Sequence, residues 1–194
     1  ASYMKYKLNV IWFVCCVLLS GCETASSITE PISDLLTDPI VLPCPEYRIL
    51  ADAAKFEKFK PGEGRALIDL DYETTIINMR LACKTQIEKD TRNGYMDISV
   101  KLDFLAKRGP ENQFKQSDFI YFLSVTDRDY KILYREQFKI VFAFKRNTSQ
   151  MIMASKPITL QLPITKNISS DNFIIFSGFQ TSREQLLRNR KNKR

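Results

Sequence analysis

The sequence predicts an all-β protein, an immunoglobulin-like antiparallel β-sandwich of about seven strands that is followed by a short C-terminal helix. Apolar residues repeat with period two through most of residues 44–180, Gly, Pro and Asn turn signals separate the repeats, and no interior segment has a long helical pattern. A small closed barrel is the alternative that the same pattern allows. The chain is 44% hydrophobic and 11% aromatic, which indicates one folded domain rather than a disordered chain.

The bounds of the expected strands follow from the alternation and from the turn signals between them. Alternation changes parity near Ile76 and Ile77, which predicts a β-bulge or a strand that passes from one sheet to the other. Residues 119–125 are apolar on both faces and are expected to form a central strand, whereas the Lys-rich residues 51–64 are expected to form a loop. Strands are expected at residues 44–50, 68–83, 96–104, 119–125, 138–144, 158–162 and 173–179.

The last residues, 181–194, change to a helical pattern. Thr181 and Glu184 have the spacing of a capping box, in which a hydroxyl and a carboxylate satisfy free backbone N–H groups at a helix start. Leu186 and Leu187 follow, and the cations after them suit the negative end of a helix dipole. The sequence therefore predicts a short helix that ends in a basic tail.

Residues 1–21 have the composition of a signal peptide. Lys5 and Lys7 precede an apolar run at residues 8–19 in which Asn9 is the one polar residue. A helix needs about 20 apolar residues to cross the hydrocarbon core of a bilayer, so this run is too short to be a stable anchor. Residues 1–3 precede Met4 and are interpreted as a start-site artefact or an appended segment.

The segment Leu19-Ser20-Gly21-Cys22 resembles the lipobox of bacterial lipoproteins. The resemblance implies that the Cys22 sulfur carries a diacylglyceryl group, that cleavage falls before Cys22, and that the palmitate-type anchor holds the protein on a membrane. Glu23 follows Cys22 where enterobacterial proteins retained at the inner membrane tend to have Asp, so the family rule favours the outer membrane, facing the periplasm. The alternative is an ordinary secretory signal. Residues 22–43, which contain three prolines, are expected to form the lipidated start and a flexible tether.

Processing leaves Cys44 and Cys83 as the remaining thiols. An oxidising periplasm favours a disulfide between them, which would close a loop of 39 residues and stabilise the fold by roughly 4 kcal/mol. Two free buried thiols are the alternative.

Positive charge is concentrated at the C-terminus. Residues 22–194 carry 27 bases and 22 acids, and residues 183–194 hold six of these bases and one acid, so 21 of each remain in the body. Contact with an anionic lipid surface or an acidic envelope protein is one interpretation of the tail, and a solvated end is the other. The candidate surface-binding residues are Arg183, Arg188, Arg190, Lys191, Lys193 and Arg194.

Catalytic chemistry is poorly supported by the residue types present. The chain contains no His, which excludes Ser-His-Asp and Cys-His sites. Asp69 and Asp71 share a strand face, but calcium takes six to eight oxygens, so these two carboxylates are expected to be solvated. We therefore expect no catalytic residue, no metal, no cofactor and no nucleic-acid partner.

Short motifs widen the resemblance to a group of alphaproteobacterial envelope lipoproteins without an assigned activity. The sequence therefore favours a lipid-anchored envelope protein that acts as a non-enzymatic interaction or scaffolding module with a protein partner. A carrier of lipid or another small ligand, with an apolar pocket between the sheets, is the alternative. An enclosed cavity would favour the carrier, whereas a filled core with an exposed apolar patch would favour the interaction module. The motifs are Cys44-Pro45, Phe59-Lys60-Pro61-Gly62, Arg108-Gly109-Pro110, Gly178-Phe179-Gln180, Glu184-Gln185-Leu186 and Asn189-Arg190.

Overall fold

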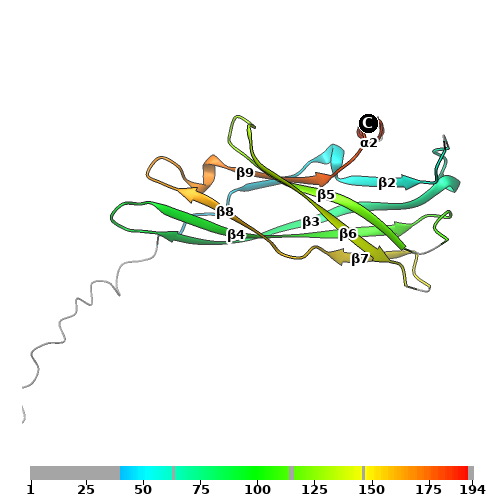
Figure 1. Ribbon diagram of the computed structural model, residues 1–194, viewed down its shortest axis with the longest axis horizontal. Coiled ribbons are helices and arrows are strands. Elements are labelled where there is room, and N and C mark those ends of the chain that lie inside the picture. Colours follow the sequence, from blue (N-terminus) through cyan, green and yellow to red (C-terminus); the bar gives the residue numbers. More distant parts are fainter. Residues whose placement is uncertain (1–39, 63, 114–115, 146, 192–194) are drawn as a thin grey trace, which may run out of the picture. The chain divides into compact units, whose positions relative to one another are not determined.

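Two packed β-sheets and one short helix make up the part of the chain that the computed structural model describes, residues 40–62, 64–113, 116–145 and 147–191 (Figure 1). One sheet has the strand order β1-β9-β5-β6 and the other the order β2-β3-β4-β7, with β8 also paired to β4. The predicted all-β sandwich with a C-terminal helix is confirmed. The strands are β1 (Glu46–Ile49), β2 (Lys55–Phe59), β3 (Leu70–Ile87), β4 (Gly94–Arg108), β5 (Gln116–Thr126), β6 (Ile132–Ala143), β7 (Gln150–Ala154), β8 (Ile158–Ile164) and β9 (Ile174–Phe179).

The pairing order is that of an immunoglobulin-like Greek key. The hairpins β3–β4 and β5–β6 are antiparallel, and two pairings link strands distant in sequence, β4 with β8 and β5 with β9. In the lettering of that fold, β3 and β4 correspond to strands A and B, β5 and β6 to C and C′, and β7, β8 and β9 to D, E and F. The four pairings above are then its A–B, C–C′, B–E and C–F pairs. The place beside F is occupied by β1, which runs parallel to β9, and β7 pairs with β4 rather than with β8.

The predicted parity change is confirmed, and two strands were missed. The register of β3 against β4 shifts between Ile76 and Asn78, which is the expected bulge. β2 lies within residues 51–64, so the prediction of a loop there was wrong for residues 55–59, and β7 was not predicted. Short 3₁₀ turns, η2 (Ala51–Ala53), η3 (Leu67–Asp69) and η4 (Ser170–Asn172), lie among the connections.

The core between the sheets is filled by aromatic side chains from both. Phe104 of β4 lies 4.9 Å from Phe119 of β5, centroid to centroid, and Tyr72 of β3 meets Phe142 of β6 edge to face at 5.4 Å. The Tyr72 hydroxyl donates to the Asp118 carbonyl, and burial raises the pKa of Tyr72, which keeps this hydroxyl protonated. Edge-to-face and tilted pairs of this kind stabilise a core beyond their buried area.

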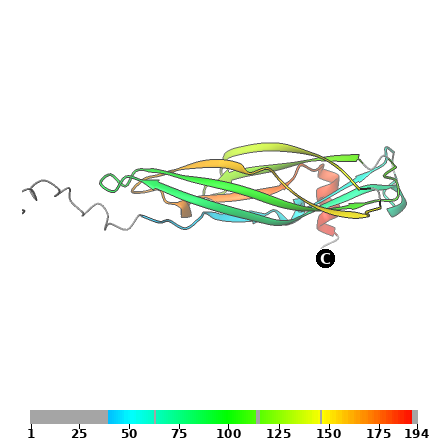
Figure 2. The same cartoon turned by 90° about the horizontal axis from the view of Figure 1, so that it is seen from below.

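Helix α2 (Arg183–Lys191) lies across the direction of the strands (Figure 2). The Ser182 hydroxyl accepts a hydrogen bond from the Gln185 N–H at 3.2 Å, so Ser182 caps the helix, one residue later than the Thr181 start predicted from the sequence. Gln185 and Asn189, one helical turn apart, are buried and share a face. Their amides donate to the Glu57 carbonyl at 3.1 Å, and to the Asp52 and Lys55 carbonyls at 2.7 and 2.9 Å.

A disulfide joins Cys44 to Cys83, as the sequence predicted, with the two Cα atoms 5.7 Å apart. Cys44 lies just before β1 and Cys83 lies in β3, so the bond links segments that belong to different sheets. Cys22 and the predicted leader and tether up to residue 39 lie outside the described residues.

Candidate functional site

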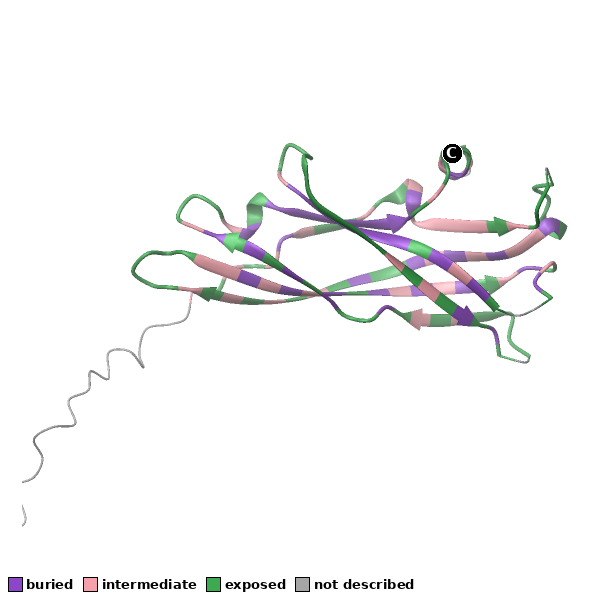
Figure 3. Ribbon diagram, in the orientation of Figure 1, coloured by how far each residue is buried: buried purple, intermediate pink, exposed green. Residues whose placement is uncertain are grey.

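Strand β6 forms a long, exposed edge of its sheet. It is 12 residues long, pairs with β5 on one side, and ends the strand order on the other. Figure 3 shows most of its length as exposed. Four of its large apolar side chains are exposed: Ile132 at 56%, Leu133 at 50%, Tyr134 at 38% and Val141 at 58%.

Three of the other sheet edges are short, capped or interrupted. The part of the β3 edge that β2 leaves uncovered, residues 77–87, has Ile77 as its one exposed large apolar residue. The β2 edge is capped by α2, because Gln185 and Asn189 bind the Lys55 and Glu57 carbonyls of that strand. β1 has only four residues. The edge formed by β7 and β8 contains Pro157 between the strands and Pro163 within β8, and proline has no N–H to offer a neighbouring strand. Natural sheets protect their edges in these ways.

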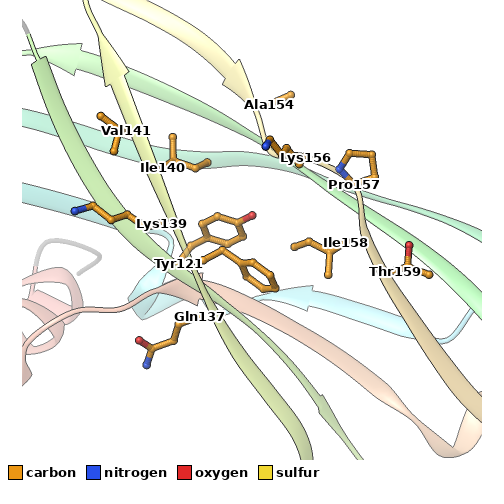
Figure 4. Close-up of a pocket in the computed structure, with 11 residues that line it drawn as sticks. Tyr121, Gln137, Lys139, Ile140, Val141, Ala154, Lys156, Pro157, Ile158 and Thr159 are labelled. Carbon is orange, nitrogen blue, oxygen red and sulfur yellow. The ribbon is translucent and has the colours of Figure 1, made fainter.

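An open groove of about 780 Å³ lies between β6 and the β7–β8 edge (Figure 4). Tyr121 of β5 lies in the middle of the opening, between Ile140 of β6 and Ile158 of β8. Phe138 stacks on Tyr121 with centroids 5.3 Å apart. The lining residues are Tyr121, Gln137, Phe138, Lys139, Ile140, Val141, Ala154, Lys156, Pro157, Ile158 and Thr159, and none of these is a carboxylate or a thiol.

The interruption between β7 and β8 shapes one wall of the groove. The Ser155 N–H donates to the Leu102 carbonyl at 2.8 Å, and the Ser155 hydroxyl accepts from the Leu102 N–H at 3.1 Å. Ser155 is thereby held in the sheet, while Lys156 and Pro157 after it are exposed. Burial raises the pKa of Tyr121, against a smaller opposing effect of its hydrogen bond with Ser155, so the hydroxyl stays neutral.

The charged side chains that line the groove are both lysines. Lys139 pairs with Asp118 at 2.8 Å, and this hydrogen bond is the main cause that holds the pKa of Asp118 below its ordinary value. Among the described residues, Lys156 makes no ion pair. The site thus combines an apolar floor with positive charge at its rim.

A smaller hollow of about 200 Å³ extends the same opening between β6 and β8. It is lined by Val125 and Tyr134 on one side and by residues 159–162 of β8 on the other. The Tyr134 hydroxyl donates to the Glu136 carboxylate, and this bond raises the pKa of Tyr134 to about 12. The two hollows together follow the β6 edge.

The predicted basic tail is partly engaged within the fold. The Arg190 guanidinium lies 2.7 Å from the Asp52 carboxylate. Arg188 pairs with Glu184 on the same helix and lies over the Phe59 ring, 5.5 Å from its centroid. Arg183 and Lys191 are exposed on α2, while Lys193 and Arg194 lie outside the described residues. Of the described tail cations, Arg183 and Lys191 are therefore the ones most available to an anionic surface.

Sequence reasoning did not single out the groove residues. The alternation of Phe138 and Ile140 with Lys139 identified a half-buried strand, and it carried no information on which other strand would border it. A Lys-Pro pair after a strand-like Met151-Ile152-Met153 run is the signal that could have indicated an interrupted edge. The expectation that Asp69 and Asp71 share a strand face and are both solvated was wrong. Asp69 lies in η3, is buried and pairs with Lys60 at 2.6 Å, whereas Asp71 lies in β3 and accepts a hydrogen bond from the Asn112 amide at 2.5 Å.

Comparisons with known proteins do not assign this chain to a family. No protein family and no curated protein matches the chain. The variable (V) domain of the Streptococcus agalactiae AgI/II polypeptide BspA is 14% identical to it, with 66% of this chain and 73% of that one covered at a TM-score of 0.15. A TM-score this low does not indicate a shared fold. Within the described part of the chain, no helix is long and apolar enough to cross a membrane.

Proposed function

We propose that this protein is a non-enzymatic interaction module that binds a protein partner by strand addition to β6. The observation that carries the proposal is the contrast among the edges. β6 is long, free of proline and lined with four exposed large apolar residues. The edges at β1, β2 and β7–β8 are short, capped or interrupted, and the free part of β3 carries mainly polar exposed side chains. An exposed edge presents unpaired N–H and C=O groups, which an extended partner segment can pair with.

The filled core supports a protein partner over a ligand held between the sheets. Phe104 and Phe119 occupy the interior, and the groove beside them is open to solvent rather than enclosed. A carrier of lipid or another small ligand is the second candidate, and the apolar floor of the groove around Tyr121 and Phe138 is the observation in its favour.

We further propose that Cys22 anchors the mature chain to a membrane of the cell envelope, in the periplasm. The order of charge, apolar run and Leu19-Ser20-Gly21-Cys22 supports an acylated N-terminus. The Cys44–Cys83 bond supports an oxidising compartment, because disulfides persist there and are rare in the cytosol.

Site-specific photo-crosslinking in intact envelopes tests the β6 proposal. A benzophenone amino acid is placed at Leu133 or at Val141 of β6, and at the exposed Leu67 of η3 as the matched control. We expect the same partner to be captured from both β6 positions and not from Leu67. Equal capture from all three positions, or none from β6, would contradict strand addition.

Membrane fractionation tests the anchor. Cys22→Ser removes the acyl acceptor and is expected to move the protein to the soluble fraction, since lipid chains contribute about 0.8 kcal/mol of membrane affinity per buried CH₂. Cys16→Ser, within the predicted leader, is the control and is expected to leave retention unchanged. Retention of the Cys22→Ser protein would show that another feature holds it on the membrane.

A further inference from the structure

We infer that the β6 groove selects an extended partner segment in which apolar residues alternate with acidic ones. This inference rests on the proposed strand addition and specifies the chemistry of the segment that would be added. It depends on the arrangement of apolar and charged side chains around the opening.

An added strand would present its side chains alternately to the groove and to the outer face of the sheet, because successive residues of a strand point to opposite faces. On the groove side they would meet Phe138, Ile140 and Ile158, which are at least partly buried and uncharged. Apolar side chains at every second position of the partner would cover this floor and remove it from water.

On the outer face the added strand would meet positive charge. By the β5–β6 register Arg135 and Lys139 lie on this face, whereas Glu136, the acid of β6, is opposite the buried Leu123 and lies on the groove face. Lys139 is opposite the exposed Ile120 in the β5–β6 register and so lies on the outer face, beside the path of an added strand. Opposite charges on neighbouring strands stabilise pairing, whereas like charges weaken it.

Lys156 extends the same preference across the opening. It follows Ser155 at the break between β7 and β8, is exposed, lines the groove, and makes no ion pair among the described residues. Pro157 and Pro163 make its own edge a poor template for a strand, so Lys156 is available as a cation facing a segment bound to β6. Because Lys156 is exposed at the rim rather than in the apolar floor, its long side chain can reach past the groove-facing apolar residues to a carboxylate at the edge of that segment.

Two synthetic peptides test this selection on the chain that begins at residue 22 and carries Cys22→Ser. Both have nine residues with Val at alternate positions. One has Asp or Glu at the positions between, and the other has Lys there. Fluorescence anisotropy at low and high salt measures binding of each. We expect the acidic peptide to bind and the basic one to bind at least several-fold more weakly, with a difference that shrinks as salt screens the charges.

Charge reversal at the groove supplies the matched control. Lys156→Glu is expected to weaken binding of the acidic peptide roughly three- to ten-fold and to strengthen binding of the basic one. Lys166→Glu makes the same change of net charge on an exposed loop residue outside the groove and is expected to leave both affinities unchanged. Equal effects of the two substitutions would show that the net charge of the protein alone sets the preference for the acidic peptide, and this would overturn the inference.

The outcomes separate this inference from the proposed function. Equal binding of both peptides, with crosslinks still confined to β6, would overturn the acidic preference and leave strand addition standing. Failure of both peptides together with binding of palmitate, the negatively charged acyl-chain probe, would overturn the inference and favour the carrier. Loss of the β6 crosslinks would contradict the proposed function, strand addition to β6, itself.

Discussion

At the scale of single residues, Cys44 and Cys83 hold the first strand to the opposite sheet. β1 contributes only four residues and pairs with β9 alone, so its own hydrogen bonds fix it weakly. The bond joins positions 39 residues apart in sequence, which removes much of the freedom of the unfolded chain. The placement of β1, which completes the sheet on the side opposite β6, therefore depends on oxidation.

Reduction of the disulfide is expected to lower the free energy of unfolding by roughly 4 kcal/mol, because a loop of this length loses its closure constraint. Urea unfolding with and without dithiothreitol measures the change. A Cys44→Ala, Cys83→Ala double variant is the control, since reductant should not alter its unfolding midpoint. A reduced wild-type protein as stable as the oxidised one would contradict the prediction.

At the scale of elements, α2 is docked by hydrogen bonds more than by an apolar face. Leu187 is 48% exposed, whereas Gln185 and Asn189 are buried and bind carbonyls at the β2 edge. An edge strand has carbonyls without a neighbouring strand, and the helix satisfies them. This is how a short strand with little apolar content remains part of the sheet.

Asn189→Ala is expected to destabilise the protein by about 2 kcal/mol, because two carbonyls, those of Asp52 and Lys55, lose their donor in a buried setting. Leu187→Ala on the same helix is expected to change stability by less than about 0.5 kcal/mol, since its side chain is largely exposed. Urea unfolding compares the two, and hydrogen exchange at β2 locates the effect. Similar values for both variants would mean that the helix is held in another way.

The elements that sequence reasoning found are those with a local signal. The alternation from Met96 to Phe104 identified β4, and the parity change at Ile76 identified the bulge in β3, because both follow from period two. β2 has apolar residues at Phe56 and Phe59 only, three apart, so it has no strand pattern of its own. Its conformation comes from pairing with β3 and from the cap by α2, which are tertiary contacts.

The candidate site could not be predicted for the same reason. Phe138 lies in β6 and Lys156 lies at the break between β7 and β8 of the other sheet, and only the folded arrangement makes them two walls of one groove. The disulfide could be predicted because counting the thiols left one pair, a constraint that does not depend on geometry. Local alternation and the number of thiols were therefore enough to predict most strands and the disulfide. The surfaces formed between elements depend on how those elements pack, which the sequence pattern does not show.

At the scale of the whole molecule, ion pairs tie neighbouring strands together. Glu73 of β3 lies between Lys55 of β2, 2.8 Å away, and Lys107 of β4, 3.1 Å away. Burial alone would raise the pKa of Glu73, but the hydrogen bonds and charges of the two lysines outweigh it and hold that pKa below its ordinary value of 4.5. The pKa values of Glu46, Asp69 and Asp118 are lowered as well.

The lowered pKa of Glu73 predicts a stability that falls in acid. A carboxylate with a lower pKa in the folded than in the unfolded state contributes its full stabilisation above the unfolded value, and loses it as pH falls through the folded value. The free energy of unfolding should therefore be level from pH 7 to about pH 5 and decline below about pH 4.5. Glu73→Gln should lower stability at pH 7 and flatten the decline, because it leaves Lys55 and Lys107 without this partner at every pH.

Urea unfolding from pH 3 to pH 7 measures both effects, with Asp129→Asn in the exposed turn at residues 127–130 as the control of equal charge change. The control removes one negative charge without removing a link between strands, so its curve should run parallel to that of the wild type. If Asp129→Asn flattened the acid limb as much as Glu73→Gln does, the pH dependence would follow from net charge. The three-strand link at Glu73 would then have no special part in holding β2, β3 and β4 together.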